Sequence, residues 1–166
     1  MGLAAFNALP ADRAEEALLA VCAAPSWVAQ VTASRPYQSK DLLVEEAGAA
    51  YDRLSWPELA TALAAHPRIG QRPAGESREA AWSRREQSGV QGAPEGVQAA
   101  LEEANRAYEE RFGHLFLIFA SGRTAPEILA AARERLGHDD ETERRVVRDE
   151  LRKIVALRLE RLVSTA

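Results

Sequence analysis

The histidine at position 66 lies in the sequence His66-Pro67-Arg68-Ile69-Gly70, directly after a helical pattern. The residue before a proline is disfavoured in the α region, so we expect the preceding helix to end at His66. An imidazole has an unperturbed pKa of about 6.5, which suits proton transfer near neutral pH. His66 is therefore a candidate general acid or base. Its spacing alone favours a simpler role, in which it only satisfies carbonyl groups at the helix end.

Three polar side chains of different chemistry stand at helical spacing between residues 83 and 87. Ser83, Glu86 and Gln87 occupy positions i, i+3 and i+4, so a helix places them on one face. A hydroxyl, a carboxylate and an amide together could bind a small and highly polar molecule. The simpler interpretation is an ordinary solvated helix surface.

One arginine lies on the apolar stripe of the last predicted helix. Arg158 comes four residues after Ile154 and four before Leu162. A guanidinium on the inner face of a helix needs an anion, and a carboxylate fits its two parallel donors. An equally good alternative is an arginine at the border of the stripe whose charged end reaches water.

An apolar run over residues 116–120 breaks at Ser121-Gly122. Such a break can present backbone N–H groups to the carbonyl or carboxylate oxygens of a ligand. A plain core segment followed by a turn is the simpler interpretation, and the run alone favours it.

The sequence contains none of the common signatures of a metal or cofactor site. Cys22 is the only cysteine, so a thiolate metal site and an internal disulfide are excluded. Neither His114 nor His138 forms a metal-ligand pattern with another histidine, and no phosphate-binding glycine motif or nucleophile elbow occurs. We therefore predict a protein that works without a metal and without an organic cofactor.

Charge and hydropathy exclude two classes of partner. The chain has 21 Lys and Arg against 25 Asp and Glu, a net charge of −4, whereas a nucleic-acid-binding surface needs clustered basic residues. The longest purely apolar run, over residues 115–120, is far shorter than the ~20 residues that span a bilayer. The start of the sequence lacks a signal-peptide pattern, so we expect a cytoplasmic location.

These residues must be positioned by helices. Ala, Leu, Glu and Arg dominate the 166 residues, and 46% of the chain is hydrophobic. We predict one all-α domain over 1–166, an irregular bundle of about eight helices. Ser55-x-x-Glu58 and Thr124-x-x-Glu127 are capping boxes, and Gly113 suits a helix C-terminus. For 115–119 we favour a helix or an irregular buried segment over a lone strand. The predicted helices begin near residues 10, 25, 39, 55, 77, 94, 124 and 139.

Three motifs in this order and spacing give the chain a resemblance that spans nearly its whole length. It resembles the family of decarboxylases that act on 2-oxo-4-hydroxy-4-carboxy-5-ureidoimidazoline (OHCU). The C-terminal Leu157-Arg158-Leu159 is also similar to that family. The three motifs are His66-Pro67-Arg68-Ile69-Gly70, Ser83-x-x-Glu86-Gln87 and Asn105-x-x-Tyr108-x-x-Arg111-Phe112-Gly113-x-x-Phe116.

The resemblance implies a cofactor-free carboxy-lyase of purine degradation, which acts after urate oxidation and the hydrolysis of 5-hydroxyisourate. Its substrate is the ureidoimidazoline OHCU, and its products are S-allantoin and carbon dioxide. The family is all-helical and typically dimeric, so a homodimer is expected. The catalytic residues of the family fall on His66 and Glu86. Its substrate contacts fall on Pro67, Ser83, Gln87, Arg158 and the backbone of Ile118, Phe119, Ala120, Ser121 and Gly122.

Two other classes of function stay open at this point. One is a helical ureide-binding module that keeps the fold without the reaction. The other is a hydrolase or isomerase of a related ureide, which could use the same histidine and glutamate.

Overall fold

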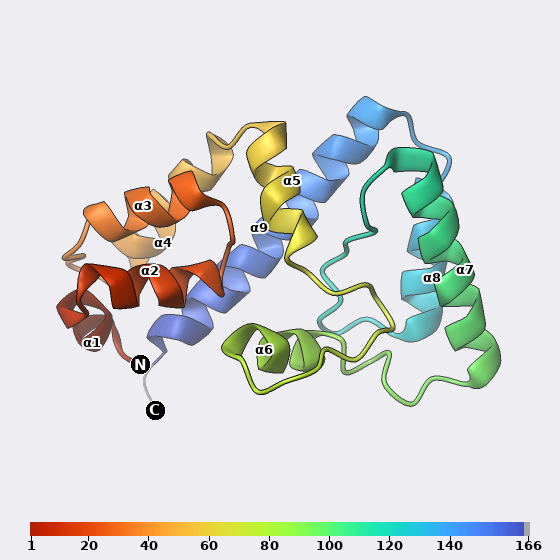
Figure 1. The fold of residues 1–166 in the computed structure, drawn as a ribbon, viewed down its shortest axis with the longest axis horizontal. Helices are drawn as coiled ribbons and strands as arrows, with labels where there is room; N and C mark the ends of the chain where they lie inside the picture. Colours follow the sequence, from red (N-terminus) through yellow and green to blue (C-terminus); the bar gives the residue numbers. More distant parts are fainter. Residues whose placement is uncertain (165–166) are drawn as a thin grey trace. The chain divides into compact units, whose positions relative to one another are not determined.

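The computed structural model describes residues 1–164, and over that range it contains nine α-helices and no strand (Figure 1). The predicted all-α class is confirmed. The last two residues of the domain predicted over 1–166 lie outside the described residues. No helix of the described part is long and apolar enough to cross a membrane. The helices are α1 (Leu3–Ala8), α2 (Ala11–Leu19), α3 (Pro25–Ala33), α4 (Lys40–Asp52), α5 (Trp56–Ala64), α6 (Arg78–Glu86), α7 (Glu95–Phe112), α8 (Ala125–Arg135) and α9 (Asp140–Val163).

The predicted helix ends are formed by the side chains expected to form them. The Ser55 N–H donates to Glu58 Oε2 over 2.7 Å, and the Glu58 N–H donates back to Ser55 Oγ over 3.4 Å. Thr124 Oγ1 accepts from the Glu127 N–H at 3.3 Å. Gly113 ends α7 with a φ of 77°, in the left-handed region that glycine enters without a steric penalty. The two capping boxes and the α7 terminus are thus confirmed.

The chain divides into two compact units. Unit 1 comprises residues 1–62 and α9 from residue 152 onward, and unit 2 comprises residues 63–151. Helices α5 and α9 each contribute residues to both units.

In unit 1, α3 packs against α2 and α4, and the buried indole of Trp27 donates to the Ala47 carbonyl over 2.9 Å. The short helix α1 was not expected from the sequence. Its C-terminal carbonyls are satisfied by a distant side chain, because Arg35 Nη1 donates to both Phe6 O and Leu9 O at 2.8 Å. Such a long-range contact leaves no local pattern, which explains why α1 was missed.

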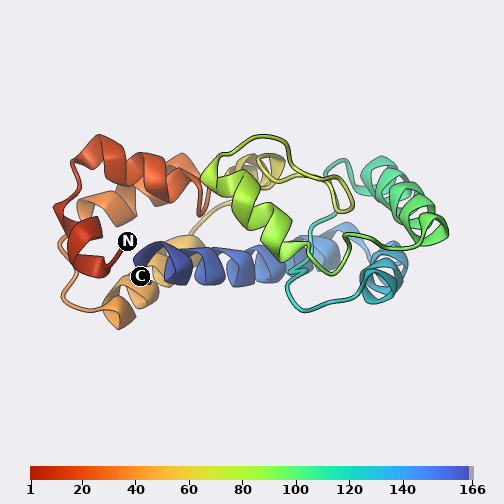
Figure 2. The same ribbon diagram turned by 90° about the horizontal axis from the view of Figure 1, so that it is seen from below.

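In unit 2, α7 and α8 lie side by side in both views (Figures 1 and 2). The segment that joins them runs in teal from the end of α7 to the start of α8 (Figure 1). Its residues 115–120 have no regular secondary structure, although most of them are buried. Of the two expectations for this run, the irregular buried segment is confirmed and the helix is wrong. The core around it contains Ile69, Val90, Leu101, Tyr108, Phe116, Ile118, Ala120, Ile128 and Ala132.

Cys22 provides a test of the packing of unit 1. The side chain is buried, and desolvation of the thiolate raises the pKa of Cys22 from 9.0 to about 11. Since the thiolate is the reactive species, this shift alone slows alkylation of the native protein at pH 8 by about 100-fold relative to the unfolded chain. Labelling by iodoacetamide with and without denaturant, followed by mass spectrometry, measures the ratio. Native labelling as fast as that of the unfolded chain would contradict the described packing.

Candidate functional site

His66 lies just beyond the end of α5. The helix ends at Ala64, and the His66 N–H donates to the Leu63 carbonyl over 3.0 Å, which closes the last turn. The predicted helix end is confirmed. His66 and Pro67 are both half-buried. They open on a cavity of about 430 Å³, whose lining includes His66, Pro67, Arg68, Glu109, His114 and Leu115.

The loop after His66 is fixed to α7 by two contacts. Arg68 forms a bidentate pair with Glu109, with distances of 2.6 Å from Nε to Oε1 and 3.1 Å from Nη2 to Oε2. The next residue, Ile69, is buried, and its carbonyl accepts from Asn105 Nδ2 over 2.8 Å. Asn105 opens the third motif of the sequence, and this hydrogen bond explains why an amide is useful there.

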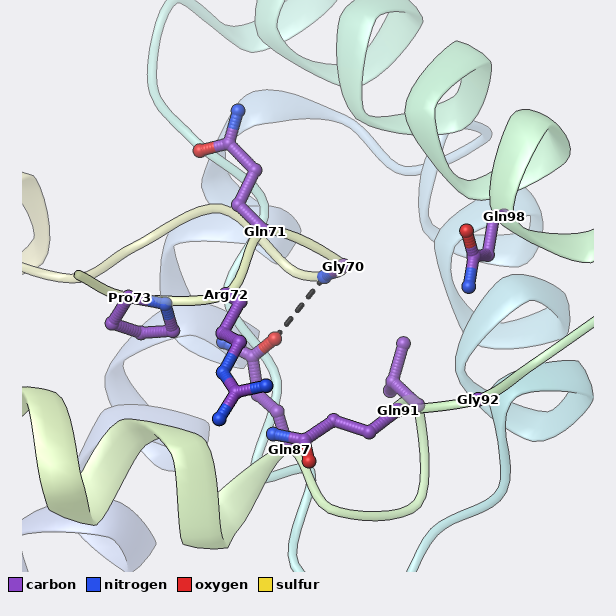
Figure 3. A pocket seen from close by; sticks show the side chains of 9 residues that line it. Gly70, Gln71, Arg72, Pro73, Gln87, Gln91, Gly92 and Gln98 are labelled. Atoms are coloured by element: carbon purple, nitrogen blue, oxygen red, sulfur yellow. Dashed lines mark hydrogen bonds between the residues drawn. The ribbon is translucent and has the colours of Figure 1, made fainter. Parts of the chain in front are cut away.

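A third contact fixes the same loop to the end of α6. The Gly70 N–H donates to Gln87 Oε1 over 3.1 Å, the dashed line in Figure 3. Gly70 has a φ of 91°, so a side chain at this position would be strained. The bond directly joins the motif that contains His66 to the motif that contains Glu86. Beside it lies a cavity of about 220 Å³ whose lining is rich in amide groups, from Gln71, Gln87, Gln91 and Gln98.

The polar face predicted on residues 83–87 is buried. Ser77 caps α6 through a hydrogen bond from the Ala80 N–H at 3.1 Å, and the helix ends at Glu86. Ser83, Glu86 and Gln87 are only 4%, 6% and 7% exposed, so the solvated-surface interpretation is wrong. Burying a hydroxyl, a carboxylate and an amide is costly unless each is paired. Of the three, Gln87 lines the cavity of about 220 Å³ described above.

The segment 118–122 is built from irregular backbone. The side chains of Ile118 and Ala120 belong to the core of unit 2 and are buried. Arg123 forms a turn with its N–H on the Ala120 carbonyl at 3.0 Å, and its Nε donates to the Phe119 carbonyl at 3.1 Å. The buried side chains thus serve packing, and the ligand contact expected for the backbone of 118–122 stays a prediction.

Arg158 belongs to unit 1, in α9. It is 3% exposed, so the alternative of an arginine that reaches water at the border of the stripe is wrong. Its Nη1 donates to the carbonyl of Ala20, at the end of α2, over 3.0 Å. The substrate contact that the resemblance implies for Arg158 stays a prediction.

Sequence inspection missed a buried ion pair in unit 2. Arg135 and Glu143 are 5% and 0% exposed, and Arg135 Nε lies 2.7 Å from Glu143 Oε1. Glu143 stands four residues before the buried Val147, and Arg135 three residues after the buried Ala132. The criterion that singled out Arg158, a charge on an apolar stripe, would therefore have found both.

The two remaining histidines have local partners. His114 Nδ1 lies 3.2 Å from the Leu115 carbonyl, and His138 Nδ1 lies 3.0 Å from Glu143 Oε2. Within residues 1–164, no group of three or more His, Cys, Asp or Glu side chains is arranged to hold a metal ion.

Several known proteins similar to this chain are named OHCU decarboxylases. A family model described as OHCU decarboxylase matches residues 7–160. Curated 2-oxo-4-hydroxy-4-carboxy-5-ureidoimidazoline decarboxylases are similar to it: the protein of Haloferax volcanii is 30% identical and that of Amia calva 31%. These matches cover 80% and 84% of this chain and 79% and 81% of the relatives.

Two further comparisons concern length and fold. The Uric acid degradation bifunctional protein TTL of Arabidopsis thaliana is 30% identical over 86% of this chain, which spans 45% of that longer protein. A crystal structure of OHCU decarboxylase in the presence of (S)-allantoin superimposes with a TM-score of 0.79. It is 26% identical, and the match covers 91% of this chain and 99% of that one. The chain belongs to the OHCU decarboxylase family.

Proposed function

We propose that this chain decarboxylates OHCU to (S)-allantoin and carbon dioxide, with His66 as the proton-transfer residue and Glu86 as its partner in catalysis. Family membership supports the reaction. One structural observation supports the assignment to these residues. The Gly70–Gln87 hydrogen bond joins the loop that follows His66 to the end of the helix that buries Glu86.

The chemistry needs little besides placement and proton transfer. The substrate carries a carboxylate and a hydroxyl on one ring carbon, with a C=N bond at the neighbouring carbon. The bond to the carboxylate breaks, its electron pair moves toward the C=N nitrogen, and carbon dioxide leaves. The hydroxyl loses its proton as it becomes the ring carbonyl, while the neighbouring carbon and the ring nitrogen each gain one. One proton is thus taken up overall, and the substrate provides its own electron sink.

The protein would supply the proton route and the polar contacts. His66, half-buried beside its cavity, would take the hydroxyl proton and return a proton to one face of the neighbouring carbon. Glu86 would orient His66 or hold the hydroxyl. Because Gln87 Oε1 accepts from Gly70, the Nε2 amide of Gln87 is the donor it offers to a substrate oxygen. Pro67 and Ser83 would contact the bound substrate, and backbone N–H groups of 118–122 would bind its oxygens.

The H66A variant tests the central assignment. General acid–base catalysis contributes about 10² to 10⁴ in rate, so we expect kcat to fall by that factor while the helical circular dichroism is unchanged. The assay supplies OHCU freshly generated from urate and follows optical activity. Near-normal formation of (S)-allantoin by H66A would contradict the assignment. Slow racemic allantoin with the unaltered protein would overturn the decarboxylase itself and favour a ureide-binding module, whereas a different ureide product would favour a hydrolase or isomerase.

The E86Q variant tests the buried carboxylate. The substitution keeps the shape of the side chain and removes its charge, so we expect a loss of about 100-fold in kcat with little change in unfolding temperature. E79Q is a matched control, because Glu79 lies in the first turn of the same helix. If E86Q and E79Q show equal turnover, Glu86 has no catalytic role.

We also propose a cytoplasmic location and a homodimeric state; the resemblance described above supports the homodimer. Sedimentation equilibrium should then give twice the chain mass of 18.1 kDa. A mass of one chain at micromolar concentration would contradict the dimer.

A further inference from the structure

The buried pair of Arg135 and Glu143 joins three helices of unit 2. Glu143 stands in the first turn of α9, Arg135 in the last turn of α8, and Tyr108 in α7. Glu143 Oε1 accepts from Arg135 Nε at 2.7 Å and from the Tyr108 hydroxyl at 2.5 Å, and Arg135 Nη2 lies 2.5 Å from the same oxygen. The other carboxylate oxygen faces His138 Nδ1 at 3.0 Å.

Two charges withdrawn from water are costly, and this pair is stabilised by its surroundings. The guanidinium carbon of Arg135 lies 4.6 Å from the centre of the Phe116 ring and 5.7 Å from that of Tyr108, within the range of cation–π attraction. Burial, and then the hydrogen bond to Glu143, raise the pKa of Tyr108 well above its ordinary value, so its hydroxyl keeps its proton and donates. A site built with this much support holds Arg135 in one orientation.

The remaining nitrogen of that guanidinium, Nη1, points away from Glu143 and forms a hydrogen bond with the backbone. Arg135 Nη1 donates to the Leu117 carbonyl over 2.6 Å, in a buried contact. Leu117 directly precedes the segment 118–122, and residues 1–164 contain no strand that could fix it. The Phe119 carbonyl accepts from Arg123 Nε, and the Ala120 carbonyl accepts from the backbone N–H of Arg123. Two arginine side chains and one backbone turn therefore provide the hydrogen bonds that fix this segment.

We propose that Arg135 is a positioning residue for the decarboxylation: by fixing the Leu117 carbonyl, it orients the backbone of 118–122 toward the substrate. This inference rests on the proposed function, since it assumes that this backbone binds the substrate. Arg135 itself does not touch the reacting atoms. Glu143 holds Arg135 through its carboxylate, and Tyr108 acts on Arg135 through its hydroxyl bond to that carboxylate.

The R135K variant separates positioning from mere stability. A lysine has its N–H donors on one nitrogen and lacks the planar fork with which Arg135 reaches the carboxylate and the Leu117 carbonyl from different nitrogens, so we expect the bond to Leu117 to be lost. Y108F is the matched control, because it removes one hydrogen bond to Glu143 and leaves the bond from Arg135 to Leu117. A displaced contact near a substrate costs up to about 100-fold, so we expect R135K to lower kcat/KM by 10- to 100-fold, mainly through KM. Y108F should lower the unfolding temperature and leave kcat/KM within about twofold.

Amide hydrogen exchange provides a readout that does not depend on activity. In R135K the amides of 118–122 should exchange at least about tenfold faster than in the unaltered protein, while in Y108F their exchange should be unchanged.

Equal kcat/KM for R135K and Y108F would overturn the inference, whatever the exchange rates. An unaltered protein without decarboxylase activity would overturn the proposed function together with this role, so the two failures are distinguished. If R135K does not fold, R135M/E143Q removes both buried charges while keeping a partner for Tyr108, and the same comparison is made with it.

Discussion

Two segments of unit 2, the partly exposed loop after His66 and the mostly buried residues 115–120, have no regular secondary structure. Where their backbone groups are buried, these groups must find partners among side chains. In an all-α protein no sheet can supply them. The loop after His66 is held at Ile69 by Asn105 and at Gly70 by Gln87. The segment before Ser121 is held at Leu117 by Arg135. These few hydrogen bonds fix the non-helical backbone on which the proposed chemistry depends, and the helices serve to place their donors and acceptors.

This constraint explains residues in the sequence motifs that have no direct chemical role. Asn105 and Tyr108 are one helical turn apart on α7, and each faces a different irregular element: Asn105 bonds Ile69, and Tyr108 bonds the carboxylate that holds Arg135. One helix face thus supports both the histidine loop and the anchor of the 118–122 segment. A substitution of Asn105 would therefore alter the geometry of the histidine loop without removing any catalytic group.

The features predicted from the sequence are those fixed by local spacing. The caps at Ser55 and Thr124 and the end of α5 before His66 depend on residues within four positions of each other. The features that were missed depend on distant partners. Helix α1 needs Arg35, which lies 29 residues from Phe6, and the function of Arg135 needs Leu117, 18 residues earlier. The burial of Glu86 could not be predicted either, because it depends on other elements of the fold. A carboxylate on a helix face is solvated unless another element covers it.

A reaction in which the substrate accepts its own electron pair needs from the protein only orientation and a proton route. Both are matters of fixed backbone and fixed polar groups, because a displacement of about 1 Å near the reacting atoms can cost 100-fold in rate. Irregular segments bonded by buried side chains meet this need better than mobile surface loops, since a buried donor cannot exchange its partner for water without a penalty. This need also explains why unit 2 contains the buried charge pair of Arg135 and Glu143. An apolar pair of the same volume could stabilise the fold as well, but it could not hold the Leu117 carbonyl.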